Sequence, residues 1–162
     1  TPIAFKLPVG TGIEPGVVRG LVSSVDVLPT ICELVGVAPP GAIDGRSLLP
    51  MMASGAPGRD AAYIQFDGNG ARGNFQRAVI HAEYKLIVDM FKDETYLELY
   101  DVVADPEETT NLAFQSDQRE RLERMAGLLS AHMKDTGDLL SIAPDVVDVF
   151  LTDYTPVRSS RR

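Results

Sequence analysis

The chain has 162 residues, of which 44% are hydrophobic and 23% are charged, a composition typical of globular proteins rather than of disordered or fibrous ones. Its 15 Lys and Arg residues against 23 Asp and Glu residues give a net charge of −8, the wrong sign for binding nucleic acid or an anionic membrane surface. The single cysteine, Cys32, excludes an internal disulfide framework, and with only His81 and His132 beside it a cysteine- or histidine-based metal site is excluded as well.

No targeting or membrane-spanning segment is evident in the sequence. It contains no apolar run of about 18 residues, and residues 1–6 have neither the basic flank nor the apolar stretch of a signal peptide. We therefore expect a soluble protein and leave its compartment open. The first residue is Thr1 rather than methionine, which favours a mature, trimmed or excised piece of a longer protein.

The first third of the chain predicts one strand and one helix between loops. Short apolar pairs alternate with Gly and Pro over residues 1–20, which indicates a strand at residues 3–7 and then an irregular loop. A helix is predicted over residues 27–35, because Ser24 or Asp26 can cap it, Pro29 fits its first turn and Gly36 suits the position past its end. The prolines and glycines of residues 38–60 mark a connector between two lobes.

Beyond the connector, apolar residues recur with the period of two that is typical of strands. Residues 61–67 and 96–102 each predict a strand, and residues 78–88 alternate for too long to form a single one. We break this segment at a tight turn near Ala82 and place another turn near residues 92–94. The result is a four-stranded antiparallel meander.

Two helical segments follow the strands. Asp105 can cap a helix that has Pro106 at its first position and an acid, Glu108, three residues after the cap. A longer helix is predicted over residues 117–134, with an apolar stripe that should pack on one face of the sheet. The stripe consists of Leu122, Met125, Ala126, Leu129 and Met133.

The segment Gly68-Asn69-Gly70-Ala71-Arg72-Gly73 matches the G-x-G-x-x-G pattern of dinucleotide-binding loops. That site requires a helix after the third glycine, so that the helix N-terminus faces the phosphates, whereas here the following residues alternate like a strand. We therefore interpret the segment as a hairpin loop. Its polar residues Asn69 and Arg72, together with Asn74, are candidates for reaching a neighbouring site.

The acids between residues 89 and 108 raise the alternative of a divalent-metal site. They fall at predicted turns and helix starts and include no calcium-loop pattern, so a solvated, capping role fits them better. His81 and His132 have no sequence-local Ser or Asp partner, and Cys32 lies beside the apolar stripe of its helix. From the residues alone we identify no catalytic or metal-binding constellation.

Three stretches, taken in order, resemble the C-terminal portion of sulfatases of the alkaline phosphatase superfamily. Residues 22–37 are similar to the family's V-S-x-V-D-L-x-P-T-x-x-x-L-x-G-V segment, and residues 44–50 to its G-x-S-L-x-P connector. Residues 77–87 and 98–113 are similar to R-A-V followed by Y-K-L-I, and then to E-L-Y-D-L-x-x-D-P-x-E-x-x-N-L-A. The order and spacing of these matches make the combined resemblance specific.

This resemblance implies a division of the chain into three parts. Residues 1–50 would be the tail end of the large α/β sulfatase domain, and they would include the strand at residues 3–7 and the short helix. Residues 51–137 would form the small C-terminal subdomain, an α+β unit of four antiparallel strands packed on a helix, and residues 138–162 would be an extension. The meander and helix read from periodicity agree with this architecture.

The resemblance also implies chemistry that this chain does not carry. Sulfatases of this family use a formylglycine made from the cysteine of a C-x-P-x-R motif, together with a calcium ion. Cys32 lacks that motif, and no metal ligand of the family has a counterpart here. No catalytic or metal residue is therefore transferred to this chain. Calcium and formylglycine are implied only for an intact parent, whose catalytic domain would precede this region.

Three hypotheses follow. The first is a C-terminal sulfatase fragment, inactive alone, that shapes the rim of the parent's cleft for a sulfate-ester substrate. The second hypothesis is that the chain is the same region, with the same fold, of a phosphonate monoester or phosphodiester hydrolase. The third is a stand-alone, non-catalytic interaction module. A fragment should expose an apolar face around Val27, Leu28 and Ile31, and the chain could hide this face in a homodimer.

Overall fold

The computed structural model describes residues 3–68, 73–92 and 94–154. The chain divides into two compact units, one ending at Asp60 and the other beginning at Ala61. The division falls after the residues that the sequence assigned to a connector. Among the described residues, no helix combines the length and apolar character needed to cross a membrane.

The first unit is built from short helices joined by irregular segments. A 3₁₀ turn at Ser24–Asp26 leads directly into α1 (Val27–Leu34), which confirms the helix expected there. Gly36 follows with a φ of 70°, the left-handed conformation that suits glycine after a helix. A second helix, α2 (Leu49–Ser54), lies in the expected connector, where Pro50 in the first turn is compatible with a helix start.

The strand predicted at residues 3–7 is wrong. These residues form no regular secondary structure. A strand exists only where a neighbour completes its ladder of hydrogen bonds, and the described residues of the first unit include no strand that could do so. Apolar alternation in the sequence was therefore not sufficient to form a strand at residues 3–7.

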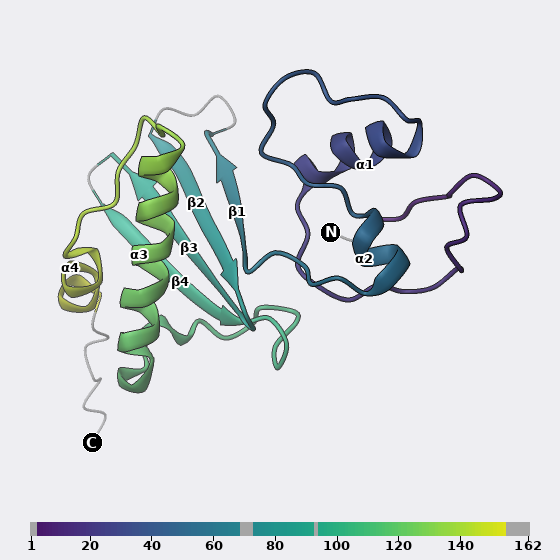
Figure 1. Cartoon of the computed structure of the whole chain (residues 1–162). Helices are drawn as coiled ribbons and strands as arrows, with labels where there is room; N and C mark the ends of the chain where they lie inside the picture. Colours follow the sequence, from purple (N-terminus) through teal and green to yellow (C-terminus); the bar gives the residue numbers. More distant parts are fainter. Residues whose placement is uncertain (1–2, 69–72, 93, 155–162) are drawn as a thin grey trace. The chain divides into compact units, whose positions relative to one another are not determined.

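The second unit contains the expected antiparallel meander (Figure 1). Its strands lie side by side in the order β1-β2-β3-β4. They are β1 (Ala61–Phe66), β2 (Asn74–His81), β3 (Tyr84–Phe91) and β4 (Thr95–Asp101). The predicted break near Ala82 is confirmed, because Ala82 adopts a left-handed φ of 53° in the turn between β2 and β3.

One face of this sheet is covered by helices (Figure 1). Helix α3 (Arg119–Asp135) buries the predicted stripe of Leu122, Met125, Ala126, Leu129 and Met133 against strand residues such as Val79 and Leu86. Helix α4 (Val146–Asp153) adds Phe150, which is 1% exposed, to the same core. Helix α4 was not expected from the sequence, and its residues lie in the segment expected to be an extension.

The helix expected to begin at Asp105 is also wrong. Residues 102–111 form turns, and the Asp105 carboxylate accepts hydrogen bonds from the Thr110 amide (2.9 Å) and the Thr109 hydroxyl. Glu108, the expected partner of a capping box, has a φ of 54° that no α-helix tolerates. Two short 3₁₀ turns, at Leu112–Phe114 and Ser116–Gln118, then lead into α3. The second unit as a whole confirms the predicted α+β class.

Candidate functional site

The three residues predicted to reach a neighbouring site belong to the connection between β1 and β2. Asn69 and Arg72 lie outside the described residues. Asn74 is the first residue of β2, opposite Phe91 of β3, and is half-buried. The chain after Gly73 continues as a strand and not as a helix, so the dinucleotide-binding interpretation lacks the helix N-terminus it needs.

Arg77 anchors the base of this β1–β2 hairpin. Its guanidinium, 4% exposed, donates to the Asp138 carboxylate through Nε (2.5 Å) and a terminal nitrogen (3.0 Å), and it also pairs with Asp67 at 2.8 Å. A further bond reaches the Phe66 carbonyl. The hydrogen bonds from Arg77 lower the pKa of Asp138 although burial opposes this. Arg77 therefore links the end of β1 to the segment that follows α3.

Asp26 has a comparable role in the first unit. Its fully buried carboxylate accepts hydrogen bonds from the Ser23 amide (2.9 Å), the Arg46 amide (2.9 Å) and Arg59 Nε (2.8 Å). Burial by itself would raise the pKa of Asp26, but these hydrogen bonds outweigh it and lower the pKa to about 2. Thr30 completes the arrangement: its hydroxyl donates to the Asp26 carbonyl and accepts from the Leu48 amide.

Asn111 closes the outer edge of the sheet. Its side-chain oxygen accepts from the Leu99 amide (3.0 Å) and the Ala113 amide (2.9 Å), and its side-chain nitrogen donates to the Leu97 carbonyl (3.1 Å). The amide thus pairs with β4 as a neighbouring strand would. Asp26, Thr30, Arg77 and Asn111 all belong to the stretches that resemble sulfatases, and in the structure each has an architectural role.

His132 and Cys32 both have packing partners or surroundings within the fold. The His132 ring stacks on Tyr63, with ring centres 3.6 Å apart, and Cys32 is buried in α1. In the part of the chain that the structure describes, no group of three or more His, Cys, Asp or Glu side chains could hold a metal ion. Asp101, in the acidic run, caps the turn at Val103 and Ala104, as the capping interpretation expects.

A polar cluster that the sequence pattern did not indicate lies on the sheet face opposite α3. There the Gln76 amide donates to the Asp89 carboxylate, and the Tyr100 hydroxyl donates to Glu98. Burial first of all, and then the neighbouring Glu98 carboxyl group, raises the pKa of Asp89. The strand alternation could have indicated this cluster, but only once the pairing of Ile87 with Glu98 was known.

A family model derived from the C-terminal region of N-sulphoglucosamine sulphohydrolase matches residues 1–135 of the chain. The chain belongs to this sulfatase family. The resemblance seen in the sequence motifs is confirmed. The match covers most of both structural units, including Asp26, Arg77 and Asn111.

Among curated proteins, arylsulfatase K of Xenopus laevis is 30% identical over 122 residues, which are 70% of this chain and 23% of that protein. The multifunctional alkaline phosphatase superfamily protein PehA of Trinickia caryophylli is 35% identical over 107 residues, 59% of this chain and 21% of the relative. The crystal structure of the phosphonate monoester hydrolase of Agrobacterium radiobacter superposes with a TM-score of 0.59 at 26% identity, covering 73% of this chain and 26% of that one. The chain thus spans about a quarter of the length of the relatives it matches.

Proposed function

We propose that this sulfatase-family region belongs to a longer hydrolase of sulfate esters, whose nucleophile and metal lie in a catalytic domain that precedes it. The observation that carries the proposal is the family match over residues 1–135 in a chain whose described residues contain no candidate metal cluster. The relatives are about four times as long as the matched region, which leaves ample chain for such a domain. Alone, residues 1–162 would then be inactive.

The residues of this chain do not fit the cofactors that a sulfatase parent would need. Cys32 is buried in α1 and is not followed by the proline and arginine of a formylglycine motif. Several of the acids are used for capping, as at Asp101, or are paired with cations, as at Asp26 and Asp138. The described residues include no group of three or more His, Cys, Asp or Glu side chains that could hold a metal ion. Calcium and formylglycine therefore belong to the proposed parent and not to this region.

An exposed apolar stripe on α1 supports an architectural role. Leu28 and Ile31 are each 46% exposed and Val35 is 64% exposed, and these positions share one side of the helix. The expected exposure at Leu28 and Ile31 is present, while Val27 is half-buried. We propose that the preceding domain covers this stripe. A homodimer that hides it stays a prediction.

We also propose that the β1–β2 connection contributes to the rim of the parent's substrate cleft through Asn69, Arg72 and Asn74. The Arg77 anchor, with Asp67 and Asp138, holds the base of this connection in place, and a held base limits the positions that its polar residues can reach.

The test compares the 162-residue chain with the full gene product. Both would be assayed on an aryl sulfate with calcium present. We expect turnover by the full product and none by the chain alone. Robust turnover by the chain would refute the fragment proposal, and an inactive full product with a correctly modified cysteine would refute the sulfatase assignment.

A second candidate is phosphonate monoester hydrolysis, favoured by the structural likeness to the Agrobacterium radiobacter enzyme. The same preparations would be assayed on an aryl phosphonate monoester. A full product that prefers the phosphonate by more than about tenfold in kcat/KM would favour this candidate over the first. A gene that begins at this chain and yields a stable monomer would instead support the third hypothesis, a stand-alone interaction module.

A further inference from the structure

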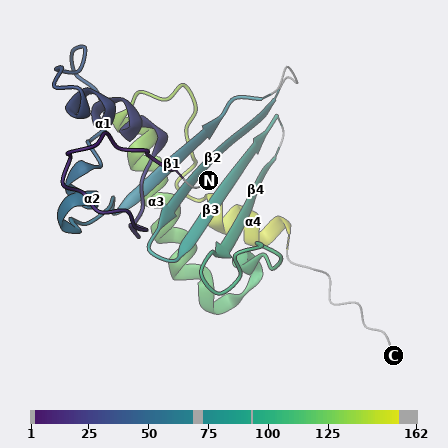
Figure 2. The same ribbon diagram turned by 90° about the vertical axis from the view of Figure 1, so that its right-hand side faces the viewer.

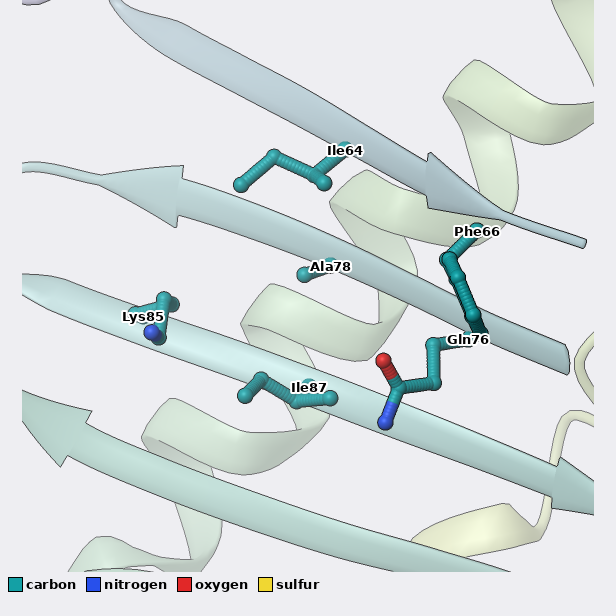
Figure 3. A pocket seen from close by; sticks show the side chains of 6 residues that line it. All are labelled: Ile64, Phe66, Gln76, Ala78, Lys85 and Ile87. Carbon is teal, nitrogen blue, oxygen red and sulfur yellow. The ribbon is translucent and has the colours of Figure 1, made fainter. Parts of the chain in front are cut away.

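The sheet of the second unit has one face that α3 and α4 leave uncovered, since both helices lie behind the strands (Figure 2). Side chains on this open face alternate along each strand with those that enter the core. A shallow hollow of about 150 Å³ lies on it and is lined by Ile64, Phe66, Gln76, Ala78, Lys85 and Ile87 (Figure 3). Ligand pockets usually enclose about 300–1,000 Å³, so the hollow is too small to be one. The charged groups beside it are a separate feature.

Two carboxyl groups become neighbours on the open face through the register of β3 and β4. Asp89 of β3 lies opposite Tyr96 of β4, and Glu98 is two residues further along β4. Residues in this diagonal relation point to the same face of an antiparallel pair, and long side chains can reach one another across it. The two acids therefore connect the strands across the ladder, although the residue directly opposite Glu98 is Ile87.

Each of these carboxyl groups accepts a hydrogen bond from a neutral donor. The Gln76 amide, in the hollow, donates to Asp89 at 2.5 Å, and the Tyr100 hydroxyl donates to Glu98. Asp89 is only 5% exposed. A buried carboxylate is costly when no cation pairs with it, and a second carboxylate beside it adds repulsion. This arrangement favours a state in which one of the two groups carries a proton.

The cation on the same face of β3 has another partner. Lys85, which also lines the hollow, pairs with Glu108, and its ammonium lies 5.8 Å from the centre of the Tyr100 ring (Figure 3). Across residues 3–68, 73–92 and 94–154, no ion pair involves Asp89 or Glu98. The titratable groups on this side of β3, β4 and the turns after β4 are Lys85, Tyr96, Tyr100 and Glu108. Because Glu108 offsets the charge of Lys85, the negative charge of the two acids is not neutralised by these groups.

We propose that Asp89 and Glu98 act as a proton-sharing carboxyl pair that strengthens the pairing of β3 with β4 in mild acid and weakens it at neutral pH. With one proton present, the protonated group donates to the ionised one, as two carboxyl groups that share a site do. With both groups ionised, like charges on adjacent strands repel each other across the ladder. The proposal concerns this chain alone and does not depend on the proposed function.

Proton linkage gives the direction of the effect. Burial and Glu98 raise the pKa of Asp89 above its ordinary value of 3.8. Between pH 3.8 and the raised pKa, the folded unit holds a proton that the unfolded chain has released. This contribution to stability is therefore complete below pH 3.8 and is lost as the pH rises through the raised pKa. Asp26 of the first unit has a lowered pKa, so the two acids respond to pH in opposite directions.

Urea unfolding of the 162-residue chain tests the pair, with tyrosine fluorescence as the signal because every tyrosine lies in the second unit. Glu98→Gln removes one charge and keeps an oxygen that accepts from Tyr100. At about pH 7.5 we expect this variant to raise the urea midpoint by about 0.5 M, and at about pH 4 we expect no rise. The exposed Glu107→Gln should change neither midpoint. No rise at neutral pH, or an equal rise at both pH values, overturns the proposal.

Two further measurements keep the test independent of any one variant. In the original chain, carbon-13 NMR of the Asp89 carboxyl carbon should show a titration midpoint above 3.8; a midpoint at or below 3.8 overturns the proposal. The double variant Asp89→Asn with Glu98→Gln should raise the urea midpoint at neutral pH no further than the more stabilising single variant, because either substitution removes the repulsion. Gains that add together would show that the two acids act separately, which contradicts a shared proton.

Discussion

The substitution Asp26→Asn should destabilise the first unit selectively. The carboxylate of Asp26 is fully buried and holds Ser23, Arg46 and Arg59 in place. Folding lowers its pKa from 3.8 to about 2, so at neutral pH the ionised carboxylate favours the folded unit by about 2 kcal/mol. Asparagine cannot accept all of these bonds and leaves Arg59 without its partner. We expect a loss of at least about 2 kcal/mol.

Cys32 provides a reporter for this loss. It is the only cysteine of the chain, it is buried in α1, and it becomes reactive when the first unit opens. A loss of about 2 kcal/mol should accelerate its labelling by about thirtyfold under native conditions. Glu33→Gln is the matched control, because it removes an exposed carboxylate from the same helix. If Cys32 is labelled at rates within twofold of each other in the Asp26→Asn and Glu33→Gln variants, the buried carboxylate of Asp26 does not stabilise the first unit as expected.

The pH dependence gives an independent check. A carboxylate with a depressed folded pKa contributes its full stabilisation above pH 3.8, and this contribution is lost as the pH falls toward about 2. Labelling of Cys32 in the original chain, normalised to the unfolded chain at each pH, should therefore rise across this window. In Asp26→Asn this rise should be absent, and a rise of the same size would contradict the assignment.

The second unit can be followed separately, because the chain has no tryptophan and all five tyrosines lie after residue 60. Asn111→Ala leaves backbone groups of β4 without their partner and should lower the free energy of unfolding by about 1–2 kcal/mol. Urea unfolding monitored by tyrosine fluorescence measures this loss. A loss no larger than that of the exposed control Gln115→Ala would refute the role of Asn111 at the sheet edge. Arg77→Met leaves the buried carboxylate of Asp138 unpaired and should cost about 3 kcal/mol in the same assay, whereas the exposed Arg124→Met should be close to neutral. Equal costs for the two arginine substitutions would show that the Arg77 anchor is dispensable.

Much of the fold of the second unit was predictable because its signals are local. Alternating apolar residues placed β1 and β4 to within one residue, but the predicted segment 78–88 began four residues after the start of β2 and ended three residues before the end of β3. The stripe of α3 appears at helical spacing. The turn at Ala82 followed from strand length alone. The family resemblance likewise depended on short motifs, and these coincide with residues such as Asp26 and Asn111 that make several hydrogen bonds each.

The errors share a physical cause. The strand at residues 3–7 and the helix at Asp105 each had suitable local residues, but a strand also needs a neighbour, and a cap can close a turn as well as begin a helix. Helix α4 was missed because it has only eight residues, and a helix this short depends on burying side chains such as Phe150 against the core.

The sequence by itself determined the class of the second unit, the family and the absence of a formylglycine motif, because each depends on residue types at short spacing. Only the tertiary structure decided which charged residues act together. Arg77 and Asp138 are 61 positions apart in the sequence. Asp89 and Glu98 become neighbours only through the register in which β3 and β4 pair. Contacts between distant positions depend on chain pairing and packing, which local propensities do not encode. For the same reason, the open face and its hollow became visible only after the strands were assembled.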